Sequence, residues 1–79
     1  MSNSEKLVDL ISEVFKISKA DLEDELTPED IEDWDSISHM ELMAKFEDEW
    51  GVMFDVEELV EMETIGLIKE ALIRHGVEL

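Results

Sequence analysis

The chain lacks several residues on which folds and active sites often depend. It has no cysteine, so no disulfide can stabilise it, and this fits a reducing compartment. Its apolar runs, such as Met53-Phe54, are far too short to span a bilayer, and residues 1–5 lack the basic and apolar regions of a signal peptide. We therefore expect a cytoplasmic protein that is complete in its 79 residues and forms one domain, residues 1–79.

Positive charge is also scarce. Six lysines and arginines stand against 23 aspartates and glutamates, which leaves a net charge of −17 at pH 7. Such a chain repels nucleic acids and anionic membranes, and it attracts partners that carry basic docking patches. We expect a monomer that neither binds nucleic acid nor inserts into a membrane. Because 44% of the residues are apolar, the charge does not imply disorder, but self-repulsion should limit stability and salt should raise it.

The first stretch of the chain predicts one amphipathic helix. Apolar residues recur at helical spacing from about residue 4 to residue 17, and Ser4 is the expected N-cap. The stripe consists of Leu7, Val8, Leu10, Ile11, Val14 and Phe15.

A long acidic connection follows, residues 18–35. It carries spaced apolar anchors, so we expect it to pack over the helices. These anchors are Leu22, Leu26, Ile31 and Trp34. Within it, Thr27-Pro28-Glu29-Asp30 combines an N-cap, a proline at the first helical position and acids in the first turn, which predicts a single helical turn.

The second helix is expected over residues 36–50, where Gly51 ends it. Its apolar residues fall on two sides, which is more apolar surface than one simple stripe needs. One side consists of Ile37, Met40, Met43, Ala44 and Trp50, and the other of Leu42 and Phe46. We expect the part near Ile37 and Met40 to remain available to partners.

Two further helices complete the prediction. The capping-box pattern Asp55-Val56-Glu57-Glu58 opens a short helix to about residue 61. Thr64 caps a last helix to about residue 74, which Gly76 ends. Since no segment alternates with a period of two, the sequence predicts an all-α fold: a small four-helix bundle with a long first loop and a short third helix.

Metal and catalytic sites find little support. Residues 21–32 match the acids of a calcium loop but place Leu26 where the sharp turn needs glycine. Glu47 and Asp48 would hold a cation only weakly. The two histidines, His39 and His75, lack a ligand partner at metal spacing and are expected on the surface or at a helix end. We expect no metal site.

Ser36 has a structural and a functional interpretation. Taken alone it is an ordinary N-cap, and Asp35 could share that role. Ser38 with Glu41 offers a rival capping box, so the helix would not need the Ser36 hydroxyl. A Ser36–His39 hydrolase would need a cleft and an oriented acid, for which four helices in 79 residues leave little room. We therefore expect a protein that is not an enzyme.

The segment around Ser36 carries a resemblance. Asp35-Ser36-Ile37, followed by Met40-Glu41-Leu42 and an acidic second half, resembles the acyl carrier protein family, the phosphopantetheine-binding carrier domain, in its discrete type. The family motif is Asp-Ser-Leu at the start of the second helix, then an apolar-Glu-Leu step. The resemblance extends over the whole chain in length, acidity, long first loop and short third helix.

This resemblance implies a function and residue roles. Ser36 would carry 4′-phosphopantetheine, donated by coenzyme A through a Mg²⁺-dependent phosphopantetheinyl transferase, and Asp35 would support the transferase site. The arm would carry acyl intermediates as thioesters to partner enzymes of fatty-acid, polyketide or related lipid biosynthesis. Docking on acyl-transferring and chain-modifying enzymes would use Ile37, Met40, Glu41, Glu47 and Asp48.

Three residues depart from the family pattern. Ile37 replaces the usual leucine, and Trp34 and His39 stand where small residues are common. Trp34 either anchors the long loop or, with His39, covers the base of the arm, and the pair favours a specialised carrier over one for housekeeping fatty-acid synthesis. A peptidyl or aminoacyl carrier and an unmodified acidic helical interaction module remain as alternatives.

Overall fold

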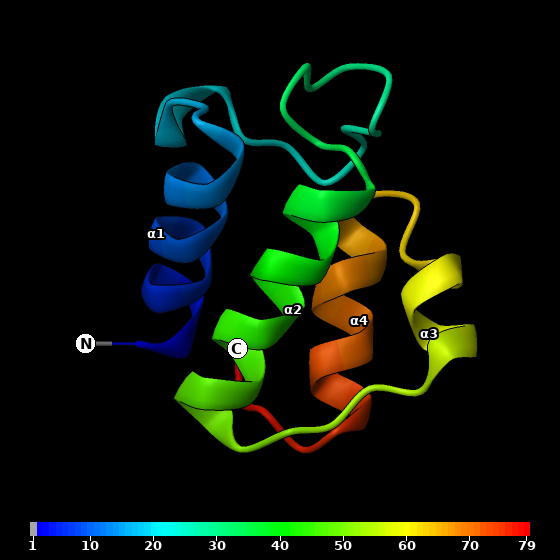
Figure 1. Cartoon of the computed structure of the whole chain (residues 1–79). Coiled ribbons are helices and arrows are strands. Elements are labelled where there is room, and N and C mark those ends of the chain that lie inside the picture. Colours follow the sequence, from blue (N-terminus) through cyan, green and yellow to red (C-terminus); the bar gives the residue numbers. More distant parts are fainter. Residues whose placement is uncertain (1) are drawn as a thin grey trace.

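A computed structural model describes residues 2–79 and shows four α-helices joined into one small bundle (Figure 1). They are α1 (Asn3–Phe15), α2 (Ser36–Trp50), α3 (Val56–Glu61) and α4 (Ile65–Arg74), with a short 3₁₀ helix, η1 (Lys19–Asp21), in the long loop. The described residues contain no strand. The all-α prediction, the long first loop and the short third helix are therefore confirmed, whereas η1 was not foreseen.

The first helix differs from its prediction at both ends. Its N-cap is Ser2, whose side chain accepts the N–H of Glu5, so Ser4 is not the cap. It ends at Phe15 because Lys16 takes the left-handed conformation with φ of 54°. The helix is therefore shorter than its apolar pattern indicates, since Ile17 lies beyond the stop and packs on the core from outside the helix.

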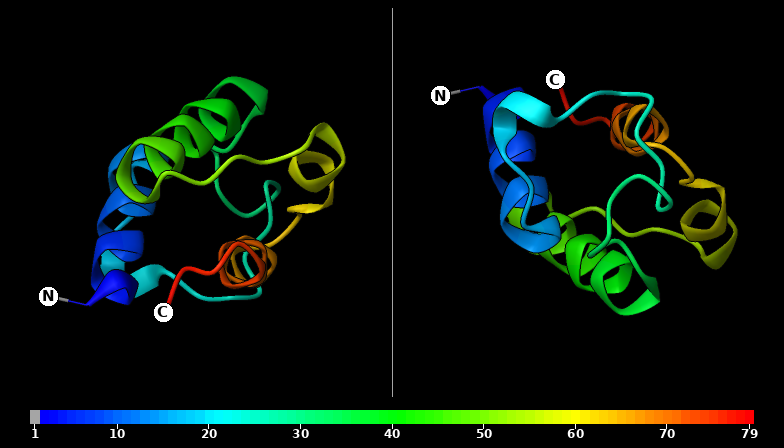
Figure 2. Two further views of the ribbon diagram at one scale, coloured as in Figure 1. Left: turned by 90° about the horizontal axis from the view of Figure 1, so that it is seen from below. Right: turned by 90° about the horizontal axis from the view of Figure 1, so that it is seen from above.

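The core lies between α1, α2 and α4, and the long loop crosses one end of the bundle (Figure 2). No polar or charged residue among those described is buried as a whole, although the hydroxyl oxygen of Ser12 is covered. The core residues are Leu7, Ile11, Val14, Phe15, Ile31, Trp34, Leu42, Met43, Phe46, Val52, Met62, Ile65, Ile68, Ala71, Leu72 and Val77. Burial of these apolar side chains stabilises the fold against the repulsion among acidic residues on its surface.

The second helix divides its faces differently from the prediction. Met43 is buried with Leu42 and Phe46, although its spacing had placed it with Ile37 and Met40. At roughly 100° per residue, Met43 lies closer to Phe46 than to Ile37 around the helix axis. The expected exposure near Ile37 and Met40 is confirmed, because these side chains are 80% and 55% exposed.

The long loop packs on the bundle, as predicted. The N–H groups of Ile65 and Gly66 at the start of α4 donate to the carbonyls of Leu26 and Asp24. A Cβ on Gly66 would lie 3.3 Å from the Cβ of Asp24, so glycine permits this close approach. The loop is thereby fixed against the end of the bundle where α2 begins.

The expected turn within the loop forms, but it stops short of a helix. The N–H groups of Asp30 and Ile31 both donate to the carbonyl of Thr27, and the Thr27 hydroxyl accepts from Glu29. Ile31 and Trp34 then enter the core directly after this turn. The turn therefore places the two fully buried anchors of the loop just before α2.

The remaining helix ends follow their sequence signals. Gly51 closes α2 with φ of 65°, and Thr64 caps α4 by accepting the N–H of Leu67. In the capping box of α3, the Glu58 carboxylate accepts the N–H of Asp55. Within residues 2–79 no helix is long and apolar enough to cross a membrane.

Candidate functional site

The N-terminus of α2 presents Ser36 to solvent. Asp35 is the N-cap, and its carboxylate accepts the N–H of Ser38 at 2.8 Å. This hydrogen bond lowers the pKa of the Asp35 carboxyl, because it stabilises the charged form. Ser36 is thus the first helical residue and not the N-cap, so the interpretation of its hydroxyl as a helix cap is wrong. Ser38 does not open a rival capping box either, because Asp35 already caps the helix. The exposed hydroxyl stays available for chemistry.

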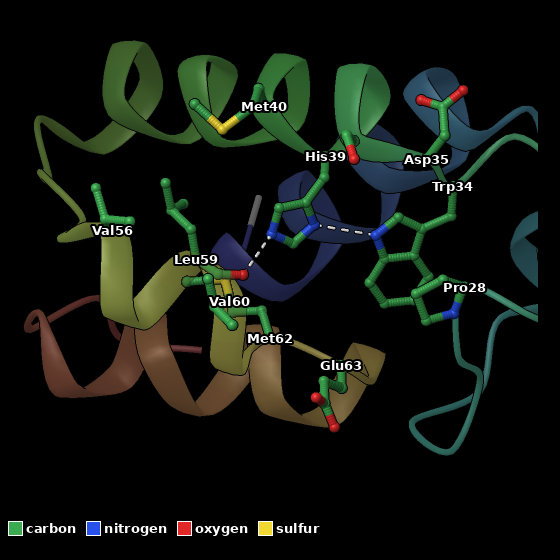
Figure 3. A pocket seen from close by; sticks show the side chains of 11 residues that line it. Pro28, Trp34, Asp35, His39, Met40, Val56, Leu59, Val60, Met62 and Glu63 are labelled. Atoms are coloured by element: carbon green, nitrogen blue, oxygen red, sulfur yellow. Dashed lines mark hydrogen bonds between the residues drawn. The ribbon is translucent and has the colours of Figure 1, made fainter.

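A groove of about 480 Å³ opens beside Ser36, between α2, α3 and the long loop (Figure 3). Its walls are mostly apolar. They consist of Pro28, Trp34, Asp35, Ser36, His39, Met40, Val56, Leu59, Val60, Met62 and Glu63. The groove therefore joins an exposed serine to a surface that can receive an apolar group.

Two aromatic residues form a polar bridge along this groove. The indole N–H of Trp34 donates to Nδ1 of His39 at 3.0 Å, and Nε2 of His39 lies 3.0 Å from the carbonyl oxygen of Leu59 on α3 (Figure 3). Burial lowers the pKa of His39, although the Leu59 hydrogen bond opposes the shift. His39 was expected on the surface or at a helix end; it lies in the first turn of α2, and its ring is half-buried between neighbouring elements.

Trp34 anchors the long loop. Its side chain is only 4% exposed, and its ring stacks on Phe15 of α1 with centroids 4.9 Å apart. The sequence named Trp34 and His39 as unusual neighbours of Ser36 but gave no sign that they would bond to each other. A spacing of five residues across a helix start does not indicate contact, because Trp34 lies in the loop and not on the helix.

The residues expected to dock partners lie on the outer face of α2. Ile37, Met40, Glu41, Glu47 and Asp48 are all exposed. On a helix with 3.6 residues per turn they share an arc of about 120°, opposite the buried residues. The structure thus brings two apolar and three acidic side chains together on one surface that begins at Ser36. Whether partners use this surface stays a prediction.

His75 lies at the end of α4, where the sequence had allowed it. It is the C-cap of the helix, its Nε2 lies 2.8 Å from Oε2 of Glu58, and its ring packs against Phe54 in a T-shaped arrangement. Among the described residues, no three histidine, aspartate or glutamate side chains gather closely enough to hold a metal ion.

Comparison with known families identifies the kind of domain. Residues 5–72 match the family model described as the phosphopantetheine attachment site. The chain belongs to this family. It is a carrier protein whose prosthetic group is 4′-phosphopantetheine, and domains of this kind carry groups rather than transform them. No curated protein matches the chain in sequence.

The site has the features that this carrier family requires. An exposed hydroxyl can form the phosphodiester, and the first N–H groups of α2, on Ser36 and Ile37, have no carbonyl of their own helix to bind. Backbone N–H groups and the helix dipole favour a phosphate at this end. The residues present at the start of α2 therefore fit the prosthetic group.

Proposed function

We propose that this carrier is an acyl carrier protein whose prosthetic group is attached to Ser36. The observation that supports this is the exposed Ser36 hydroxyl at the mouth of an apolar groove, with the Asp35 carboxylate engaged as the helix cap beside it. The bound group supplies a thiol on a flexible arm, which this chain, without cysteine, does not have itself. Acyl groups joined to that thiol as thioesters would travel between partner enzymes of fatty-acid, polyketide or related lipid biosynthesis.

Attachment requires one nucleophilic substitution at a phosphorus atom of coenzyme A, with the Ser36 hydroxyl as the nucleophile. The Ser36 Oγ forms a bond to the phosphorus that bears the pantetheine, the pyrophosphate bond of coenzyme A breaks, and 3′,5′-adenosine bisphosphate leaves. The serine proton passes to a base on the transferase, which also supplies Mg²⁺. This chain contributes the hydroxyl, the N–H groups of the helix start and the carboxylate of Asp35.

We assign the two remaining functions, binding of the acyl chain and docking of partner enzymes, to two different surfaces. We assign the groove, lined by Met40, Val56 and Leu59 among others, to the acyl chain, because its walls are mostly apolar. We assign the outer face, with Glu41, Glu47 and Asp48 around exposed Ile37 and Met40, to enzymes that carry basic docking patches.

Intact mass after incubation with coenzyme A and a promiscuous phosphopantetheinyl transferase tests the attachment. Wild type should gain one phosphopantetheine, and Ser36→Ala should gain none. Ser38→Ala is the matched control, because it removes a serine hydroxyl two residues away and should load normally. An unmodified wild type, or a modified Ser36→Ala, would exclude Ser36 as the attachment residue.

Acyl and peptidyl carriers are separated by what the loaded arm accepts. The charge of −17 favours the acyl type, because peptidyl carriers are usually less acidic. We expect the loaded protein to be charged by an acyl-activating ligase with a fatty acid but not by amino-acid-activating enzymes. Charging with amino acids alone would identify a peptidyl or aminoacyl carrier.

A further inference from the structure

Two aromatic side chains stand at the boundary between the groove beside Ser36 and the buried core. Trp34 belongs to both, because its ring lines the groove and also packs on Phe15 in the core, with ring centroids 4.9 Å apart. His39 continues this boundary from Trp34 toward Leu59 on α3 (Figure 3). An apolar group that enters the groove therefore meets these two rings before it can reach the core.

The two rings meet edge to edge. The indole N–H of Trp34 donates to Nδ1 of His39 at 3.0 Å, and the ring planes differ by only 10° with centroids 6.1 Å apart. On its other side, Nε2 of His39 lies 3.0 Å from the carbonyl oxygen of Leu59. We call the rings of Trp34 and His39, with the Leu59 carbonyl, the aromatic wall. It runs without interruption from the long loop through α2 to α3.

The wall uses all of its own hydrogen-bonding capacity. An indole N–H can only donate and a carbonyl oxygen can only accept, so Nδ1 of His39 accepts from Trp34 and Nε2 donates to Leu59. Burial lowers the pKa of His39, which favours the neutral ring that this pattern requires. Since all three ring nitrogens are paired within the wall, an apolar chain can lie against the rings without leaving a polar atom unpaired.

Passage through the wall would be unfavourable for the same chain. To separate His39 from Trp34 or from Leu59 leaves a part-buried N–H or carbonyl without a partner, and an alkyl chain has neither a donor nor an acceptor to replace it. Leu42 and Met43, one turn after His39 on α2, are 0% and 2% exposed and belong to the core behind the wall.

We propose that the aromatic wall confines an acyl chain to the groove and keeps it out of the core, so that this carrier shelters short acyl groups and leaves the far end of long ones in solvent. The inference rests on the proposed function, because it concerns the acyl group on the arm at Ser36. The groove is short, since α3 on its border has six residues and is about 9 Å long. Trp34 and His39 are thus specificity-determining residues.

The wild-type protein tests the proposal when it carries chains of different length. We would load it with butanoyl-, octanoyl- and hexadecanoyl-phosphopantetheine from the corresponding acyl-coenzyme A and verify each form by intact mass. The melting temperature should rise from the butanoyl to the octanoyl form and then stay unchanged in the hexadecanoyl form. Nuclear Overhauser contacts should join the chain to Met40 and Val56 in the groove, with none to Leu42 or Met43.

Removal of the imidazole should open the wall. In His39→Ala the hexadecanoyl chain should gain contacts with Leu42 and Met43. The hexadecanoyl form of this variant should also melt above its octanoyl form, because the longer chain buries additional apolar surface.

Two controls separate the wall from a general loosening of the site. His39→Gln keeps an acceptor for Trp34 and a donor for Leu59, so it should behave like the wild type. Met40→Ala removes a side chain that lines the groove but leaves the wall intact, so it should give no contact between the chain and the core.

Several outcomes would overturn the proposal. One is contact of the wild-type chain with Leu42 or Met43, which needs no variant to observe. Others are a His39→Ala protein that holds the hexadecanoyl chain as the wild type does, and a His39→Gln protein that admits the chain to the core. A wild type that takes no acyl-phosphopantetheine is a different result, because it refutes the proposed function and this inference with it.

Discussion

At the scale of single residues, the start of α2 separates structural from chemical roles. Asp35 caps the helix, so the Ser36 hydroxyl is not needed as the N-cap. The lowered pKa of Asp35 means that the cap stabilises the fold above the ordinary carboxyl value of 3.8 and that this stabilisation is lost as pH falls below it. Of these two neighbouring polar residues, either of which could serve as an N-cap, Asp35 is the cap and Ser36 is not.

Substitution of Asp35 should separate its cap from its charge. Asparagine also caps helices well, so Asp35→Asn should keep the melting temperature close to that of wild type. If the transferase uses the carboxylate, loading should slow by about tenfold or more, the size expected for loss of one charge-assisted hydrogen bond. Asp35→Ala should lose both functions and melt earlier.

Loading kinetics and thermal melting measured on the same samples check this prediction. Asp33→Asn is the control, because it removes a nearby acid outside the cap. Normal loading of Asp35→Asn would limit Asp35 to its structural role.

At the scale of elements, α2 has one face in the core and an opposite face exposed to solvent. Leu42, Met43 and Phe46 hold it in the core, and the opposite face carries acids around exposed Ile37 and Met40. Substitutions on the outer face should therefore alter partners without unfolding the helix, since exposed charges contribute little individually to stability.

Charge reversal tests the docking role of this face. The double variant Glu41→Lys with Glu47→Lys should lower kcat/KM of the transferase by about tenfold or more at low salt, because the acids steer a basic partner. The effect should shrink as salt screens the charges. The matched control is Glu70→Lys with Glu78→Lys, which changes the net charge equally near the other end of the chain. If both double variants load at the same rate, the outer face of α2 is not the docking surface.

At the scale of the whole molecule, charge limits stability. Few bases are present to pair with the 23 acids, and the ion pairs within residues 2–79 are all at least partly exposed. A domain of 79 residues also buries a small core. Repulsion among unpaired carboxylates should therefore be a substantial opposing contribution to the free energy of folding.

Screening should reveal this repulsion. Between low and moderate salt the melting temperature should rise, by about 4–8 °C for each kcal/mol of repulsion removed. Scanning calorimetry or circular dichroism at fixed pH measures it. A melting temperature that stays flat or falls over this range would show that packing rather than charge limits stability.

The sequence by itself determined the local features of this protein. Caps, the glycine at position 51 and helical spacing depend on neighbouring residues only, so they indicated the helices, the short third helix and the exposed serine motif. Even there local signals failed in places: Ser2 rather than Ser4 caps α1, and nothing before Lys16 shows that its backbone would turn left-handed and end the helix early.

Only the tertiary structure decided which residues meet across elements. Met43 belongs to the buried core, although the sequence offered two apolar sides of α2 and did not show which of them neighbouring elements would cover. The contact from Trp34 through His39 to Leu59 depends on where the loop and α3 come to rest. Hydrogen bonds between distant segments require a fixed relative placement, and burial of the shared apolar core supplies that placement.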